Sequence, residues 1–130
     1  MLDKIQFIIM IGVERHGSTH LPSYTIRLDD QILESKTIPD FKSNDSFASQ
    51  FDVELDYGPH TLYIEYNNPE NRGLLRIENI YVGTPSGGFS LDQMVVSESS
   101  GRTNVLKGTA LYAITFTSPF FYWALLHSKI

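Results

Sequence analysis

The stretch that decides the fold is residues 51–66, Phe-Asp-Val-Glu-Leu-Asp-Tyr-Gly-Pro-His-Thr-Leu-Tyr-Ile-Glu-Tyr. Apolar Phe51, Val53 and Leu55 alternate with acidic residues, which is the period-two pattern of a strand with one buried face. The Gly-Pro pair that follows is typical of a turn, and the alternation resumes after it. The stretch therefore predicts two strands joined as an antiparallel hairpin.

Further strand patterns lie on both sides of this stretch. Residues 24–28 and 31–38 predict a second hairpin that turns at Asp29-Asp30, and residues 74–82 and 110–117 each predict one strand. Residues 4–11 predict a strand buried on both faces, residues 39–49 a polar loop, residues 94–96 a short strand, and residues 120–126 either an aromatic strand or a short terminal helix. Short strands with almost no helical periodicity predict an all-β protein, an antiparallel β-sandwich or jelly roll.

Composition narrows the class of partner. A length of 130 residues predicts a single β-sandwich domain. Within it, residues 1–85 contain most of the predicted strands, and residues 86–130 form a loop-rich region followed by an aromatic C-terminal segment. Ten basic and fifteen acidic residues give a net charge of -5, which disfavours nucleic acid and anionic membranes as partners. Without cysteine the chain has no disulfide, no thiolate nucleophile and no cysteine-based zinc site.

The apolar segments near the two ends are short. Residues 7–11 are fewer than a signal peptide uses, and residues 119–126 fall well below the roughly 20 residues that span a bilayer. We therefore expect a protein made in the cytoplasm of its host, with the C-terminal segment buried against protein.

No pattern typical of an enzyme is present. The histidines fall in predicted loops without a metal-binding spacing, and no nucleophile elbow or phosphate loop occurs. A glycosidase needs two carboxylates facing each other across a groove. The strand carboxylates have the spacing of a solvated outer face: Asp52, Glu54, Glu65 and Glu78. The sequence predicts a protein that binds without catalysis.

Two kinds of binding residue remain as candidates. Oxygen-bearing side chains in and after the loop of residues 67–73, namely Asn68, Glu70, Asn71 and Glu78, have the ligand types that calcium prefers, although a plain turn explains the loop equally. Sugar faces stack on exposed aromatic rings, and Tyr57 and Tyr66 flank predicted turns. We expect most other tyrosines, which include Tyr24, Tyr63 and Tyr81, to be structural.

Residues 51–62 and 75–83 together resemble the calcium-dependent xylan-binding module family. Its members run from a "D-G-x-H-x-L" hairpin through a polar loop to a strand ending in "V-D-x-I-x-V-N-G", and here the corresponding segments are Asp-Tyr-Gly-Pro-His-Thr-Leu and Ile-Glu-Asn-Ile-Tyr-Val-Gly. The resemblance implies a β-sandwich over residues 3–83 and places Glu78 at the family's closing calcium ligand. Arg72 stands near the position of a further family acid.

Residues 108–126, Gly-Thr-Ala-Leu-Tyr-Ala-Ile-Thr-Phe-Thr-Ser-Pro-Phe-Phe-Tyr-Trp-Ala-Leu-Leu, are similar to the closing segment of structural proteins of tailed phages. Ala110 replaces the usual tryptophan. The resemblance implies a virion protein that assembles with copies of itself and other virion proteins. Strand alternation would bury only half of Phe120, Phe121, Tyr122 and Trp123, so we expect these four to form a protein interface.

Three functions remain open from the sequence. The first is a non-enzymatic virion structural protein of a tailed phage, a component of its head, tail or fibre. The second is a glycan-binding module that attaches to host surface polysaccharide. The third, which has the weakest basis in the residues, is a small glycoside hydrolase.

Overall fold

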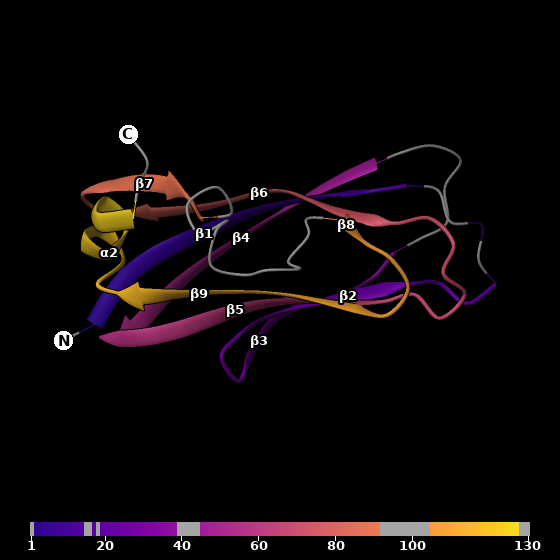
Figure 1. The fold of residues 1–130 in the computed structure, drawn as a ribbon, viewed down its shortest axis with the longest axis horizontal. Helices are drawn as coiled ribbons and strands as arrows, with labels where there is room; N and C mark the ends of the chain where they lie inside the picture. Colours follow the sequence, from indigo (N-terminus) through magenta and orange to yellow (C-terminus); the bar gives the residue numbers. More distant parts are fainter. Residues whose placement is uncertain (1, 15–16, 18, 39–44, 92–104, 128–130) are drawn as a thin grey trace.

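The chain folds into two antiparallel β-sheets packed face to face (Figure 1). A computed structural model describes residues 2–14, 17, 19–38, 45–91 and 105–127. The first sheet has the strand order β4-β1-β6-β7, with β8 also paired to β6, and the second has the order β3-β2-β5-β9. The strands are β1 (Leu2–Val13), β2 (Ser23–Leu28), β3 (Gln31–Thr37), β4 (Asp45–Asp56), β5 (Gly58–Asn67), β6 (Leu75–Thr84), β7 (Gly87–Ser90), β8 (Val105–Leu106) and β9 (Ala110–Ser118). The predicted β-sandwich is confirmed.

The predicted hairpin within residues 51–66 is wrong, because its two strands belong to different sheets. β4 pairs with β1 in the first sheet, whereas β5 pairs with β2 and β9 in the second. Only Tyr57 lies between β4 and β5, and Gly58 adopts a φ of 131° that favours glycine. Turn-forming residues predict that the chain reverses direction. They do not show whether the second strand pairs with the first or joins the facing sheet.

The second predicted hairpin, β2–β3, is confirmed, and its turn is held by β5. Asp29 has a positive φ of 52° without being glycine. Its carboxylate accepts hydrogen bonds from the Thr61 backbone N–H at 2.9 Å and contacts Nδ1 of His60 at 2.6 Å. The other His60 ring nitrogen lies 2.7 Å from the Asp56 carbonyl. The cluster therefore joins the β2–β3 turn to the crossing between the sheets.

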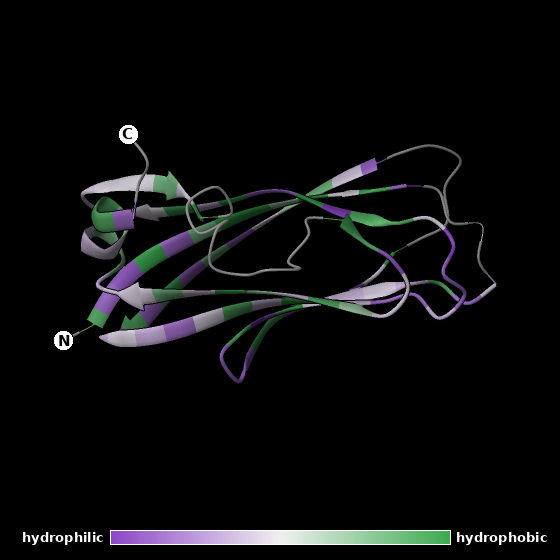
Figure 2. Ribbon diagram, in the orientation of Figure 1, coloured by the Kyte–Doolittle hydropathy of each residue, from purple (hydrophilic) through white to green (hydrophobic). Residues whose placement is uncertain are grey.

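Alternate side chains of each sheet fill the core between them. Figure 2 shows the resulting bands of hydrophobic and hydrophilic residues along β1 and β5. Phe7 and Ile9 of β1 are fully buried, as are Ile64 of β5 and Phe116 of β9. The expectation that β1 is buried on both faces is wrong, since Met10 on its outer face is 39% exposed. An apolar run in a sandwich strand therefore need not be covered on its second side.

The C-terminal segment forms the helix α2 (Phe120–His127), which settles the alternative left open by the sequence. Phe120 is fully buried and Trp123 partly so, and their rings pack at 5.8 Å from each other and at 5.6 Å and 6.4 Å from Phe116. Tyr122 is 67% exposed. The expectation that all four aromatic residues form an interface is therefore wrong for Phe120, because helical spacing turns it into the core.

Two further predictions concern the loop of residues 39–49 and the short strand of residues 94–96. The predicted loop of residues 39–49 ends earlier, because β4 already begins at Asp45 and pairs there with Val13. The predicted strand of residues 94–96 falls outside the described residues. Among the described helices, none has both the length and the apolar character that a bilayer-spanning segment requires.

The first turn of α2 donates a hydrogen bond to a side chain of a distant strand, and this bond can be tested. The backbone N–H of Phe120 donates to Oδ2 of Asp3 on β1 at 2.8 Å. We expect Asp3→Ala to lower the free energy of unfolding by about 1 kcal/mol, the usual cost of losing a capping side chain. Asp3→Asn, which keeps an acceptor oxygen, should lose less. Urea unfolding measures both, and equal stability of Asp3→Ala and the unchanged protein would contradict the capping role.

Candidate functional site

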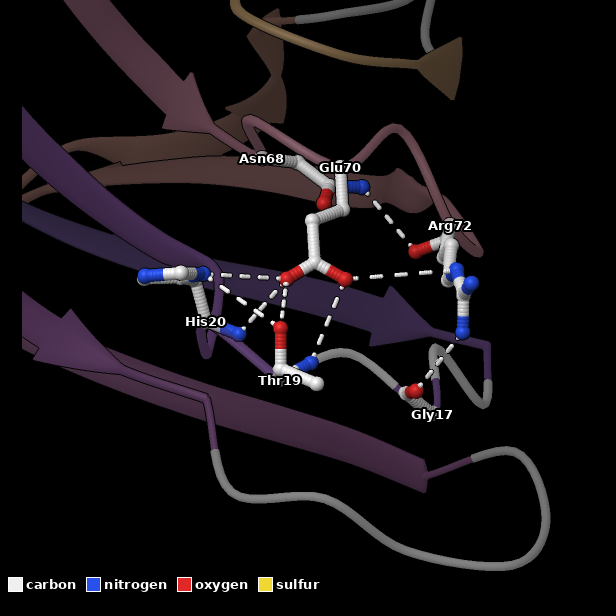
Figure 3. Close-up of polar contacts among 6 residues, drawn as sticks. All are labelled: Gly17, Thr19, His20, Asn68, Glu70 and Arg72. Carbon is white, nitrogen blue, oxygen red and sulfur yellow. Dashed lines mark hydrogen bonds and ion pairs between the residues drawn. The ribbon is translucent and has the colours of Figure 1, made fainter.

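The loop predicted to bind calcium is braced by protein groups. Figure 3 shows both carboxylate oxygens of Glu70 turned toward Thr19 and His20. Oε1 accepts a hydrogen bond from the Thr19 backbone N–H at 3.2 Å, and Oε2 accepts one from the His20 backbone N–H at 2.8 Å. The Thr19 hydroxyl also donates to Oε2, and the His20 ring lies 3.1 Å from it. These bonds, that of the Thr19 hydroxyl foremost, lower the pKa of Glu70 to about 2.

Asn68 and Asn71, two of the three asparagines of the loop, hold its shape. Asn68 is 1% exposed, and its Nδ2 donates to the Tyr66 hydroxyl at 3.2 Å and to the Arg72 carbonyl at 3.0 Å. Asn71 has a φ of 51°, a conformation that asparagine tolerates better than most residues. The guanidinium of Arg72 donates to the Gly17 carbonyl at 3.1 Å. The loop of residues 67–73 is thus tied to Gly17, Thr19 and His20.

The arrangement does not fit a calcium ion. Oδ1 of Asn68 is a buried oxygen without a hydrogen-bond partner among the described residues. The neighbouring Glu70 carboxylate, however, already accepts several hydrogen bonds, and Nε of Arg72 lies 4.0 Å from Oε1 of Glu70. Glu78 has other partners: the Ser46 hydroxyl at 3.3 Å and the Arg76 guanidinium at 3.8 Å. The described residues contain no cluster of three or more histidine or acidic side chains suited to a metal.

The two tyrosines predicted to bind a glycan lie in different environments. Tyr57, at the crossing between the sheets, is 52% exposed. Tyr66 is 2% exposed and belongs to the core, so its predicted role in a surface site is wrong. Its position before a turn suggested exposure, but it lies on the inward row of β5, where burial of a large ring stabilises the sandwich.

An open groove of about 720 Å³ crosses the outer face of the first sheet, over β4, β1 and β6. We call it the Tyr81 groove, after the one aromatic residue among those that line it. Its polar lining consists of Lys4 and Gln6 from β1, Asp52 and Glu54 from β4, and Thr84 from the end of β6. The side chains from β1 and β4 point outward because they alternate with inward-facing residues such as Ile5.

The ring of Tyr81 lies against the sheet where two glycines make room for it. A Cβ atom at position 88 would lie 1.8 Å from the Tyr81 phenolic oxygen, and one at position 83 would lie 3.2 Å from ring carbon Cε2. Gly83 and Gly88 are register partners on β6 and β7. The ring therefore covers a patch without side chains, and it remains 36% exposed. Such a ring can serve as a platform on which an apolar face of a ligand stacks.

Hydrogen-bonding groups continue the platform along the same row of the sheet. Gln6 pairs in register with both Gly83 and Asp52, and its Nε2 donates to Oδ1 of Asp52 at 2.9 Å. In the next row Nζ of Lys4 lies 3.7 Å from Oε1 of Glu54. The groove thus combines an aromatic surface with donors and acceptors, which suits a ligand that has both apolar faces and hydroxyl groups.

The two carboxylates of the groove stand on one wall. Asp52 and Glu54 are two residues apart on β4, and the residues on the β6 side of the groove, Tyr81, Gly83, Thr84 and Pro85, include no acid. Glycoside hydrolysis by the common mechanisms requires carboxyl groups on opposite sides of the scissile bond. The groove therefore has groups for binding but lacks this pair among its lining residues.

The sequence contained a signal for this groove that the choice of Tyr57 and Tyr66 passed over. Tyr81 was grouped with the tyrosines expected to be structural, yet it is followed by Gly83 two positions later on the same strand face and by the Gly87-Gly88 pair. Glycine within a strand often marks a place where another group approaches the backbone closely. Knowing which group approaches requires the pairing of β6 with β7.

Comparisons with known proteins returned little. No protein-family model matches the chain, and no curated protein matches it. One similar solved structure is a carbohydrate-binding module described as "vCBM60 in complex with galactobiose", which is 11% identical, with 80% of this chain and 95% of that chain covered, at a TM-score of 0.40. Because this likeness is weak, the fold described above rests on the strand pairing alone.

The Glu70 cluster predicts a specific dependence of stability on acid. A carboxyl group whose pKa falls from 4.5 to about 2 on folding stabilises the protein above pH 4.5, and this contribution is lost as the pH falls toward 2. We expect Glu70→Gln to lower the melting temperature at neutral pH, with the difference from the unchanged protein shrinking between pH 4.5 and 2.

The matched control is Glu78→Gln, a change to a carboxylate that makes none of the Glu70 contacts. Thermal unfolding of the three proteins across this pH range tests the cluster. A difference between Glu70→Gln and the unchanged protein that stays constant with pH would show that the charge of Glu70 does not hold the loop.

Proposed function

We propose that the protein is a non-catalytic glycan-binding module whose binding surface is the Tyr81 groove. The observation that carries the proposal is the exposed Tyr81 ring lying on the two glycines beside the polar row of Gln6 and Asp52. Sugar rings present C–H faces that stack on aromatic rings and hydroxyl groups that exchange hydrogen bonds with carboxylates and amides. The location of Asp52 and Glu54 on one wall supports binding rather than hydrolysis.

The first test is affinity electrophoresis of the protein through soluble xylan, galactan, mannan and glucan. We expect at least one of these polysaccharides to retard the protein and Tyr81→Ala to weaken that binding about tenfold, which corresponds to roughly 1.4 kcal/mol. Tyr81→Phe should retain most of the affinity because it keeps the ring.

Two matched variants sharpen this test. Gly88→Ala leaves every lining side chain in place but puts a methyl group where the Tyr81 ring lies, so it should also weaken binding. Tyr57→Ala removes an exposed tyrosine outside the groove and should bind like the unchanged protein. Melting temperatures confirm that each variant is folded. Failure of all four polysaccharides to bind, or unchanged binding by Tyr81→Ala, would refute the proposal.

A second candidate function is that of a structural subunit of a tailed-phage particle, located in the virion. The observation that favours it is the outer side of α2, where Tyr122 is 67%, Leu125 47% and Leu126 84% exposed. Burial of such apolar side chains against a neighbouring copy would stabilise an assembly. The C-terminal sequence also resembles that of phage structural proteins. Phe121 and Trp123 would hold the helix on the sandwich through their contacts with Phe89 and Phe116.

The assembly proposal predicts that Leu126→Glu prevents self-association while the subunit remains folded. Deleting the whole helix would also remove Phe120 from the core, so it cannot separate assembly from folding. Sedimentation velocity over a range of concentrations measures the association, and the melting temperature reports folding. Lys107→Glu, directly after β8, is an exposed-charge control away from the helix (Figure 1). A protein that is monomeric at every concentration would contradict self-assembly.

A further inference from the structure

The charges of the Tyr81 groove indicate which kind of glycan it would take. Its charged side chains are one amine and two carboxylates, those of Lys4, Asp52 and Glu54, so its lining has a formal charge of one minus. The amine lies 3.7 Å from Glu54 and is therefore already shared with an acid. Nothing in the lining offers a second cation to a negatively charged ligand.

The hydrogen-bonding capacity of Asp52 and Glu54 on β4 also favours an uncharged ligand. An ionised carboxylate only accepts hydrogen bonds. Gln6 and Lys4 occupy one oxygen each of Asp52 and Glu54, so the remaining acceptor positions suit donors from the ligand. Sugar hydroxyl groups are donors, whereas the carboxylate of a uronic acid is a further acceptor that carries the same charge as the wall. Placing such a ligand in the groove would bring like charges together and leave acceptors facing acceptors.

The distance between the two halves of the site sets the length of the ligand. The ring of Tyr81 lies over Gly83 on β6, while Asp52 lies on β4, with β1 and Gln6 between them. Two strand spacings separate these positions, roughly 10 Å. A single sugar unit that stacks on the ring cannot also reach the Asp52 carboxylate. Because the groove is open, a longer chain can continue beyond both contacts.

We propose that the Tyr81 groove binds neutral glycan chains of two or more units, lying across the strands, and selects against chains that carry carboxylates. This inference rests on the proposed function, glycan binding in the same groove. The preference for uncharged glycans comes from the acidic side chains of β4, so Asp52 and Glu54 are the residues that determine specificity.

The test compares derivatives of the panel polysaccharide that binds the unchanged protein most tightly. Its hydroxyethyl and carboxymethyl forms, prepared at equal degrees of substitution, differ in charge but little in bulk. We expect the hydroxyethyl form to bind about tenfold more tightly than the carboxymethyl form at low salt. The ratio should shrink toward one in the Asp52→Asn, Glu54→Gln double variant and also at high salt, where charges are screened.

Chain length is tested in parallel by calorimetric titration with the corresponding monosaccharide, disaccharide and tetrasaccharide. The disaccharide should bind at least tenfold more tightly than the monosaccharide. Equal binding of both derivatives, or a ratio that the double variant leaves unchanged, would overturn the charge preference. Equal binding of monosaccharide and disaccharide would overturn the placement across the strands.

These outcomes differ from failure of the proposed function itself. If Tyr81→Ala abolishes binding of the unmodified polysaccharide while both derivatives bind equally, the groove binds glycans but the charge inference is wrong. If Tyr81→Ala binds like the unchanged protein, or no polysaccharide binds, both proposals are overturned together.

Discussion

Between Asp56 and Gly58 the chain leaves one sheet and enters the other within a single residue, Tyr57, and the rest of the sandwich depends on this crossing. The inward positions are odd-numbered in β4 and even-numbered in β5, so the alternation shifts by one residue at the crossing, and Leu55 and Leu62 both face the common core. The crossing is held by His60, whose ring nitrogens contact the Asp56 carbonyl and the Asp29 carboxylate. Those contacts also join the β2–β3 turn to β5, so one polar cluster sets the relation between the sheets at this end.

The outer face of the first sheet follows from the same alternation. Once Val53 and Leu55 pack toward the core side of β4, Asp52 and Glu54 are placed beside Gln6 and Lys4 of β1. The neighbouring β6 contributes Tyr81, whose ring finds space because Gly83 and Gly88 lack side chains. A sheet surface of ordinary polar composition thus becomes a groove with one aromatic platform and one acidic wall.

The C-terminal helix belongs to the same core rather than to an appendage. Phe120 and Trp123 extend the aromatic packing that begins with Phe7 and Phe116, and Asp3 on the first strand receives the N–H of Phe120. The start and the end of the described chain are thereby joined (Figure 1). This packing separates the four aromatic residues into an inward group and the outward Tyr122, a distinction that depends on the helical period.

The sequence by itself determined the strands and their buried faces, because a period of two is a local property of adjacent residues. It indicated β6 and β9 within a residue or two, missed the first three residues of β5, and recognised Asp52 and Glu54 as outward-facing. Only the tertiary structure decided that β4 and β5 lie in different sheets and that Tyr66 is buried. The same holds for the hydrogen bonds that Thr19 and His20 donate to the Glu70 carboxylate. The Tyr81 groove also required it, since its residues come from three strands that are distant in sequence. Partners across a sheet are selected by the packing of the whole core, and no short window of residues contains that information.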